Sequence, residues 1–216
     1  MTARDFMDYL AAAYRELAAN GDYITALDAK TGDGDHWANL SLGFGKIMAA
    51  SEELAKLSLP AMFRKTGSIM MSAVGGSSGI LYGSAYLAAA KVAEEILAQG
   101  KDSLDVETLL ATLEAQAKAI GDRGQAKPGF KTMLDSLLAG IVAYREALVE
   151  GDDRAALLAL KAGAASGAEA TRGMEAVKGR ASYRPNKGLG ELDPGAVTMA
   201  IQLGCLADYL IDNCLK

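Results

Sequence analysis

Apolar residues recur every three or four positions along most of the chain, which is the spacing of one face of an α-helix. In the first segment Phe6, Leu10, Ala13 and Leu17 share such a stripe, and Gly21 is placed to end the helix. Similar stripes predict helices over residues 40–48, 62–73, 80–92, 105–121, 134–142, 157–164 and from Pro194 almost to the C-terminus. No run alternates as a β-strand does. The sequence therefore predicts an all-α protein with about eight antiparallel helices in a single domain, residues 1–216.

One stretch is apolar enough to resemble a membrane span. Residues 66–90 carry no charged side chain over 25 positions, which is longer than the roughly 18 apolar residues that suggest a transmembrane helix. The stretch also contains five glycines and several serines. We therefore interpret it as two buried helices joined by a turn at Gly75–Ser78, and we expect no membrane partner.

Charge and cysteine content narrow the class further. A net charge of −5 argues against a nucleic-acid-binding protein, which normally presents a basic face. The N-terminus lacks the features of a secretory signal, so a cytoplasmic protein is expected. Cys205 and Cys214 fall in the last predicted helix, roughly 13 Å apart along its axis, which is beyond the reach of a disulfide. Both are expected to be buried thiols.

Four loops rich in small or polar residues interrupt the helical pattern, and each leads directly into a helix. They are Thr31–Asn39, Gly75–Gly79, Gly124–Met133 and Lys178–Gly195. Helix N-termini carry unpaired N–H groups and attract phosphates, and glycine lets a backbone approach an anion closely. If antiparallel neighbours bring several of these N-termini to one end, that end forms an anion site. For any one loop, ordinary capping remains the alternative.

The first loop carries the candidate metal ligands. Asp28, Asp33 and Asp35 lie within eight residues, and Gly32 and Gly34 allow the backbone to turn between them. Crowded carboxylates repel one another unless they are solvated, protonated or bound to cations, and such oxygen ligands suit Mg²⁺ or Ca²⁺. The spacing does not match an EF-hand, because an indole stands where a third oxygen ligand is needed. A solvated acidic turn is the alternative.

His36, the only histidine, adjoins these carboxylates and is placed to donate a hydrogen bond to a phosphoryl oxygen. Its solitude excludes a serine hydrolase. The run Gly75–Gly79 matches the G-x-S-x-G pattern, but that elbow requires a preceding strand and a later histidine, and the sequence offers neither.

The two later loops contain basic residues that could meet a phosphate. The segment from Gly124 to Thr132 resembles a P-loop, but Phe130 separates the glycine from Lys131 and no strand precedes it. Lys131 could still reach a phosphate as a point charge, although a solvent-facing lysine is the ordinary expectation. Arg180 is a natural phosphate clamp, with an exposed surface arginine as the alternative. Asp193 and Pro194 read as the N-cap and first residue of the final helix.

The order of four segments carries a family resemblance over essentially the whole chain. They are Leu27-Asp28 with Gly32–His36 and Asn39, Gly75–Gly79 with Leu81–Gly83, Lys127–Gly129 with Lys131–Met133, and Gly179–Tyr183 through Asp193–Ala196. Together they resemble the DhaL subunits of dihydroxyacetone kinases and the matching domain of the single-chain enzymes.

The resemblance implies a barrel of eight antiparallel helices that binds ADP or ATP and two Mg²⁺ ions at one end. By motif position, Asp28, Asp33 and Asp35 are expected to bind the metal and, with Arg180, to be catalytic. The residues expected to line the nucleotide site are His36, Asn39, Ser77, Ser78, Gly124, Met133, Arg180, Asp193, Pro194 and Gly195.

The resemblance also implies partners. In this family a separate DhaK subunit or domain holds the triose, and the phosphoryl group comes from ATP or from a DhaM phosphocarrier that recharges bound ADP. A DhaK-like partner is therefore expected, and a DhaM-like partner in the second case. Homodimer formation is left open.

Three departures from the family pattern fall in these loops. Trp37 replaces a glycine, Phe130 replaces an aspartate, and the segment Arg184–Gly188 differs from the usual one. They leave the substrate and the phosphate donor open. Besides a dihydroxyacetone kinase subunit, the sequence allows a paralogue for another sugar or polyol, or a regulatory protein that senses ADP without catalysis.

Overall fold

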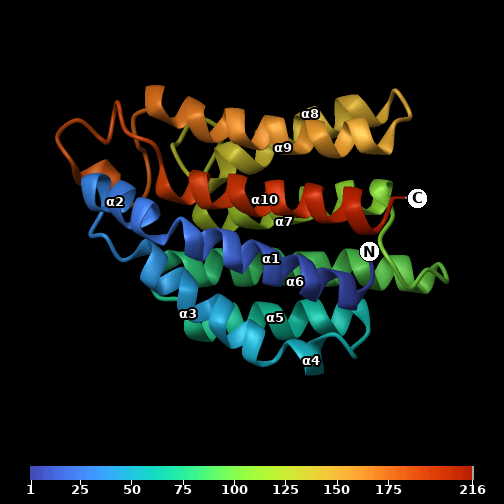
Figure 1. Ribbon diagram of the computed structural model, residues 1–216. Coiled ribbons are helices and arrows are strands. Elements are labelled where there is room, and N and C mark those ends of the chain that lie inside the picture. The colour runs from blue at the N-terminus through green and yellow to red at the C-terminus, as the bar shows by residue number, and fades with distance from the viewer. Residues whose placement is uncertain (216) are drawn as a thin grey trace. The chain divides into compact units, whose positions relative to one another are not determined.

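The computed structural model describes residues 1–215, and over these residues the chain contains only helices and no strand, which confirms the all-α class. The α-helices in chain order are α1 (Ala3–Ala19), α2 (Gly21–Thr31), α3 (His36–Ala49), α4 (Ser51–Leu54), α5 (Leu59–Ala73), α6 (Gly76–Ala98), α7 (Val106–Gly124), α8 (Met133–Leu148), α9 (Asp153–Ala170) and α10 (Pro194–Asn213). Two 3₁₀-helices, η1 (Thr171–Gly173) and η2 (Arg180–Tyr183), lie between α9 and α10. Figure 1 labels the α-helices, and its colours give their order along the chain. The closed barrel stays a prediction.

The irregular segments are shorter than the sequence pattern suggested. Gly21 does not lead into a loop, because α1 ends at Ala19 and Gly21 is already the first residue of α2, a helix that the pattern did not reveal. Helix α3 begins at His36, so the first loop shrinks to residues 32–35. Ser77 and Ser78 belong to the first turn of α6. Several expected loop residues are thus helix N-terminal residues.

The chain divides into two compact units. The first unit contains Met1–Ala12 and Asn39–Gln125, with α4, α5, α6, α7 and most of α3. The second contains Ala13–Ala38 and the chain from Ala126 onward, with α2, α8, α9 and α10. Helices α1 and α3 contribute residues to both.

The first unit is built on aromatic packing and close helix contact. The ring of Phe6 meets that of Phe63 edge-on at a centroid distance of 4.9 Å, and Tyr86 stacks on Phe63 at 6.4 Å. Helices α5 and α6 approach closely at Gly67, where a Cβ would lie 3.0 Å from the carbonyl oxygen of Gly83. A side chain at either glycine would separate the two backbones.

The second unit has three long helices that pack along one another, α8, α9 and α10 (Figure 1). Small residues bring α8 and α9 together: a Cβ at Gly167 would lie 2.5 Å from the carbonyl oxygen of Asp135, and one at Gly163 would lie 2.7 Å from that of Ala139. Helix α2 also contacts α10. Leu27 of α2 is buried there with Leu192 and Val197, and this contact holds the C-terminal end of α2 beside the N-terminal end of α10.

Helix α10 is long and apolar enough to cross a membrane by length and composition, but 61% of that window is buried inside the protein. We therefore interpret it as the core helix of its unit. Its start is as expected, since the Asp193 side chain caps it and Pro194 is its first residue. Cys205 within it and Cys214 at its end are free thiols, half-buried rather than buried.

Candidate metal centre

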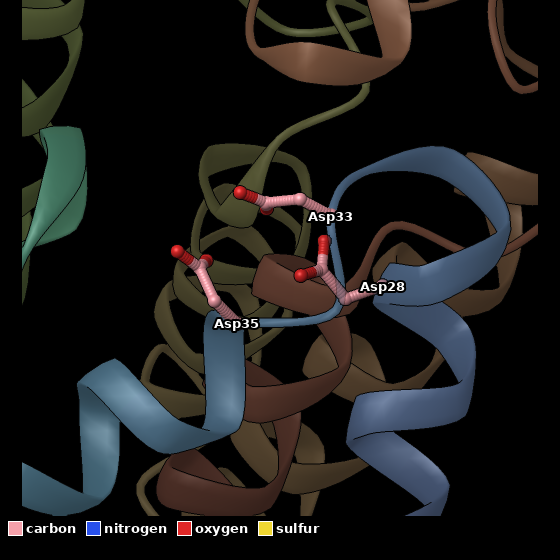
Figure 2. A group of neighbouring side chains, drawn as sticks. All are labelled: Asp28, Asp33 and Asp35. Carbon is pink, nitrogen blue, oxygen red and sulfur yellow. The ribbon is translucent and has the colours of Figure 1, made fainter.

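Three aspartates converge where α2 ends and α3 begins. Asp28 lies in the last turn of α2, Asp33 in the four-residue loop and Asp35 directly before α3 (Figure 2). Each carboxylate offers one oxygen, and these oxygens all lie within 4.8 Å of one another. Asp28 is buried, whereas Asp33 and Asp35 are exposed. The cluster therefore has one buried carboxylate and two that face solvent.

The backbone around Asp28 explains how the cluster forms. Gly32 ends α2, and its N–H donates to the carbonyl oxygen of Asp28 at 2.5 Å. A Cβ at Gly32 would overlap the Asp28 carboxylate oxygen Oδ1, so only glycine leaves this carboxylate its place. The other oxygen, Oδ2, accepts the backbone N–H of His36 at 3.1 Å. The Asp28 side chain thus links the end of α2 to the start of α3.

The donor set fits a hard divalent cation. Three carboxylate oxygens at mutual distances below 4.8 Å match the oxygen ligands that Mg²⁺ prefers, and Mg²⁺ usually completes its shell with water and phosphate oxygens. Among the described residues the cluster holds aspartates alone, without cysteine or histidine, so it lacks the ligands typical of zinc.

His36 is held by the first turn of α10. Its Nε2 lies 3.1 Å from the hydroxyl oxygen of Thr198, and that hydroxyl donates to the carbonyl oxygen of Gly195. Because the hydroxyl has a single proton, the imidazole donates from Nε2 and keeps Nδ1 as the acceptor. Burial lowers the pKa of His36, against the raising influence of Asp28 and Asp35. Burial thus favours the neutral ring, in which donation to a phosphate from Nδ1 would first require its protonation.

Two arginines from one segment reach the same loop. Nη2 of Arg180 forms an ion pair with Oδ2 of Asp33 at 2.8 Å. Nη2 of Arg184 donates to the carbonyl oxygen of Gly32, also at 2.8 Å. The first residue was expected to clamp a phosphate, and it lies beside the cluster. The second had no role in the sequence-based interpretation, and no local signal distinguishes it from any exposed arginine.

The N-terminal ends of α8 and α10 are neighbours. A Cβ at Gly195 would lie 3.6 Å from Cβ of Met133, the first residue of α8. Asp193 caps α10 by accepting the Ala196 N–H at 2.7 Å. Burial raises the pKa of Asp193 to about 7, although this hydrogen bond opposes the shift. Four residues that were expected to line the nucleotide site thus lie together in the second unit: Met133, Asp193, Pro194 and Gly195.

A buried lysine just before α8 holds the segment between α9 and α10 by hydrogen bonds to its backbone. Lys131 is only 2% exposed, and its ammonium donates to the carbonyl oxygens of Thr171, at 2.6 Å, and Glu191. The expectation of a solvent-facing lysine is therefore wrong. Burial lowers the pKa of Lys131, while the carboxylates of Asp193 and Glu191 act in the opposite direction.

Capping of α8 does not involve Phe130. The side chain of Thr132 accepts the Leu134 N–H, and the Asp135 carboxylate accepts the N–H groups of Thr132 and Gly129. Phe130, interpreted from the sequence as a departure from the family pattern, thus leaves the capping box of α8 in place.

The remaining expected site residues lie in the first unit. Gly75 lacks a Cβ where one would sit 2.6 Å from Oδ1 of Asn39, so the Asn39 amide lies against the turn that starts α6. Ser77 and Ser78 follow in the first turn of that helix, whereas Gly124 is the last residue of α7. The structure thus brings Asn39 to the serine-containing turn.

Trp37 packs toward the start of α2. A Cβ at Gly21 would lie 2.5 Å from Nε1 of the indole, and the Tyr14 ring lies 6.3 Å away between centroids. Gly21 precedes Asp28 by seven residues, about 10 Å along the helix. The half-buried indole therefore contacts the far end of α2 rather than its last turn.

Comparison with known proteins points to one family. Residues 30–208 match the DAK2 domain. The chain is 33% identical over 192 residues to the "PEP-dependent dihydroxyacetone kinase, ADP-binding subunit DhaL" of Escherichia coli, covering 88% of this chain and 89% of that one. It is 34% identical to the "PTS-dependent dihydroxyacetone kinase, ADP-binding subunit DhaL" of Lactococcus lactis, covering 93% and 94%. The mouse "Triokinase/FMN cyclase" is 35% identical, but the match covers only 32% of that longer chain.

Solved structures give the same result for the fold. The dihydroxyacetone kinase of C. freundii superposes with a TM-score of 0.71 and 25% identity, covering 94% of this chain and 34% of that one. The same enzyme "in complex with AMP-PNP and Mg2+" gives a TM-score of 0.70 and 27% identity. The DAK2 match begins two residues after Asp28, and it includes Asp33 and Asp35 and the starts of α8 and α10. This chain therefore belongs to the DAK2 domain family, the family of the DhaL subunits of dihydroxyacetone kinases.

Proposed function

We propose that this chain is the magnesium- and nucleotide-binding subunit of a dihydroxyacetone-type kinase, which transfers a phosphoryl group to a small ketose held by a DhaK-like partner. The observation that carries the proposal is the aspartate cluster at the junction of α2 and α3. It lies in a chain whose near-full-length relatives are named ADP-binding subunits. A solved relative was crystallised with AMP-PNP and Mg²⁺.

In this proposal, different residues of the second unit bind the metal and the phosphates. Asp28 is the fixed ligand, and Asp33 and Asp35 are the outward-facing ones. Mg²⁺ bound there supplies charge neutralisation on the phosphate oxygens, which is the main requirement of phosphoryl transfer. Arg180, already beside Asp33, adds a second positive charge within reach of the same phosphates. The N-terminal turns of α8 and α10 offer backbone N–H groups to the nucleotide.

Deprotonation of the acceptor hydroxyl is assigned to the partner subunit. His36 is neutral and engaged with Thr198, and the aspartates are assigned to the metal. For Asn39, Ser77, Ser78 and Gly124, which belong to the first unit, a role in nucleotide binding rests on the sequence resemblance alone. A cytoplasmic location, ADP or ATP as the bound nucleotide, and two Mg²⁺ ions complete it.

Calorimetry tests the metal assignment. ADP is titrated into the protein with Mg²⁺ and with EDTA, and the wild type is expected to bind only with Mg²⁺. Asp33→Asn and Asp35→Asn each remove one anionic ligand and are expected to abolish this Mg²⁺-dependent binding. Asp208→Asn is the matched control, because Asp208 is exposed and pairs with Lys161 in α9. Unchanged ADP affinity in the two site variants would sink the assignment.

The phosphate donor and acceptor require a second experiment. Native mass spectrometry of the purified protein tests for retained ADP, which a phosphocarrier-dependent subunit holds between turnovers. Kinase assays follow with ATP and with a DhaM-like phosphocarrier, each with and without a DhaK-like partner, on dihydroxyacetone and related small polyols. Transfer to none of them, in a protein that binds ADP and Mg²⁺, would favour a nucleotide-sensing role instead.

A further inference from the structure

The segment Arg180–Gly188, here called the arginine segment, contacts three consecutive residues at the end of α2. Arg180 pairs with Asp33, and Arg184 donates to the carbonyl oxygen of Gly32. At the C-terminal end of the segment, a Cβ on the buried Gly188 would lie 3.2 Å from Cγ2 of Thr31. Every fourth residue of the segment thus lies beside one residue of this stretch, and the two chains run in opposite directions.

Local hydrogen bonds fix the spacing of these contacts. The backbone N–H of Arg184 donates to the carbonyl oxygen of Ala181, and that of Lys187 donates to the carbonyl oxygen of Arg184. Pro185 occupies the second position of the latter turn, where its fixed φ is favourable. The Asn186 side chain accepts the N–H of Gly188 at 3.2 Å. The arginine segment is therefore a series of turns that presents its two arginines at a set separation.

The two arginine contacts differ in what can displace them. Asp33 is an expected metal ligand, so a cation at the cluster competes directly with Arg180 for its carboxylate. The pair is also exposed, with 64% and 37% of the two side chains open to solvent, and exposed ion pairs are weak. Arg184 instead donates to a backbone carbonyl oxygen, which does not belong to the carboxylate cluster. Its contact can persist whatever occupies Asp33.

We propose that Arg184 is a positioning residue that holds the arginine segment on the metal loop, so that Arg180 stays beside the site after a cation takes Asp33. The inference rests on the proposed function for its binding consequence, but the anchoring itself exists in the protein without ligands. It also assigns a role to Arg184–Gly188, a stretch interpreted from the sequence as differing from the usual family segment.

Hydrogen exchange on the ligand-free protein tests the anchor. In Arg184→Met, amides of residues 180–188 are expected to exchange about tenfold faster than in the wild type, because the segment opens locally. Lys187→Met is the matched control: it removes a positive charge from the same segment, but one that pairs with the exposed Glu175. Asp33→Asn, which breaks the Arg180 pair, is expected to keep the wild-type exchange rate. Equal rates in Arg184→Met and the wild type, or equal loosening in Asp33→Asn, would overturn the proposal.

Calorimetry with Mg²⁺ and ADP measures the binding consequence. The dissociation constant is expected to rise about tenfold in Arg184→Met, to recover within about threefold of wild type in Arg184→Lys, and to stay unchanged in Lys187→Met. The melting temperature should be the same in all of them, which separates positioning from a structural defect. Faster exchange with unchanged affinity would overturn the positioning role. If the wild type itself binds no ADP, the proposed function fails while the exchange experiment still decides on the anchor.

Discussion

The Asp28 carboxylate fills the space beside Gly32 that a side chain at residue 32 would need. The Gly32 backbone has a negative φ of −124°, so glycine is not needed here to reach the left-handed region. The requirement is steric. With only a hydrogen atom in place of a side chain, residue 32 leaves room for the Asp28 carboxylate, the one buried member of the aspartate cluster.

Gly32→Ala is therefore expected to displace the Asp28 carboxylate and to weaken Mg²⁺ binding about tenfold or more, by analogy with the loss of groups that orient ligands. Direct Mg²⁺ titration by calorimetry measures the effect. Gly173→Ala is the control, because a Cβ at Gly173 meets nothing within 4 Å and its φ is not positive. A wild-type Mg²⁺ affinity in Gly32→Ala would show that Asp28 is not a ligand.

Lys131→Met is expected to lower the free energy of unfolding by about 2 kcal/mol, because it leaves the carbonyl oxygens of Thr171 and Glu191 without their buried donor. Urea denaturation provides the measurement. Lys127→Met, an exposed lysine of the same loop, should change the free energy by less than about 0.5 kcal/mol. Equal stability of the two variants would mean that the buried ammonium makes no net contribution.

Asp193 is expected to make stability depend on pH. Its folded-state pKa of about 7 lies above the ordinary value, so the folded protein binds a proton that the unfolded chain has released. The free energy of unfolding should therefore fall as pH rises from about 4 toward 7, by at most about 1.4 kcal/mol per pH unit, and then level off.

Asp193→Asn should flatten that slope while still capping α10, since asparagine caps as well as aspartate. Urea denaturation between pH 5 and pH 8 measures both proteins. An identical slope in the variant would assign the pH dependence to other groups.

Gly21→Ala is expected to move the Trp37 indole, because the new methyl group would lie 2.5 Å from Nε1. Trp37 is the only tryptophan, so its emission spectrum reports this site alone, and a shift to longer wavelength is expected as the ring becomes more exposed. Gly173→Ala again serves as the control. An unchanged spectrum would mean that α2 shifts instead of the ring.

The parts of the fold that follow from local chemistry were predictable. Asp193 and Pro194 predicted the start of α10, because capping depends on neighbouring residues alone. Asp28, Asp33 and Asp35 were predictable as a cluster because eight residues with two glycines cannot separate them far.

The rest depended on contacts between distant segments. Helix α2 escaped notice because Gly21 resembles a helix stop, and only its contact with the Trp37 ring explains a glycine at that point. The burial of Lys131 arises from carbonyls 40 and 60 residues away, which no spacing rule can indicate. The same holds for Arg184, whose partner lies 152 residues earlier.

The turns of the arginine segment also limit which insertions and deletions the chain can accept there. Surface loops ordinarily tolerate insertions and deletions, as the exposed turn at Glu150–Asp152 between α8 and α9 is placed to do. One residue added between Arg180 and Arg184 would instead shift one guanidinium relative to the other and break one of two contacts on adjacent residues. We therefore expect this stretch of surface to tolerate changes of length poorly, while exposed residues such as Tyr183, 89% open to solvent, remain free to vary in identity.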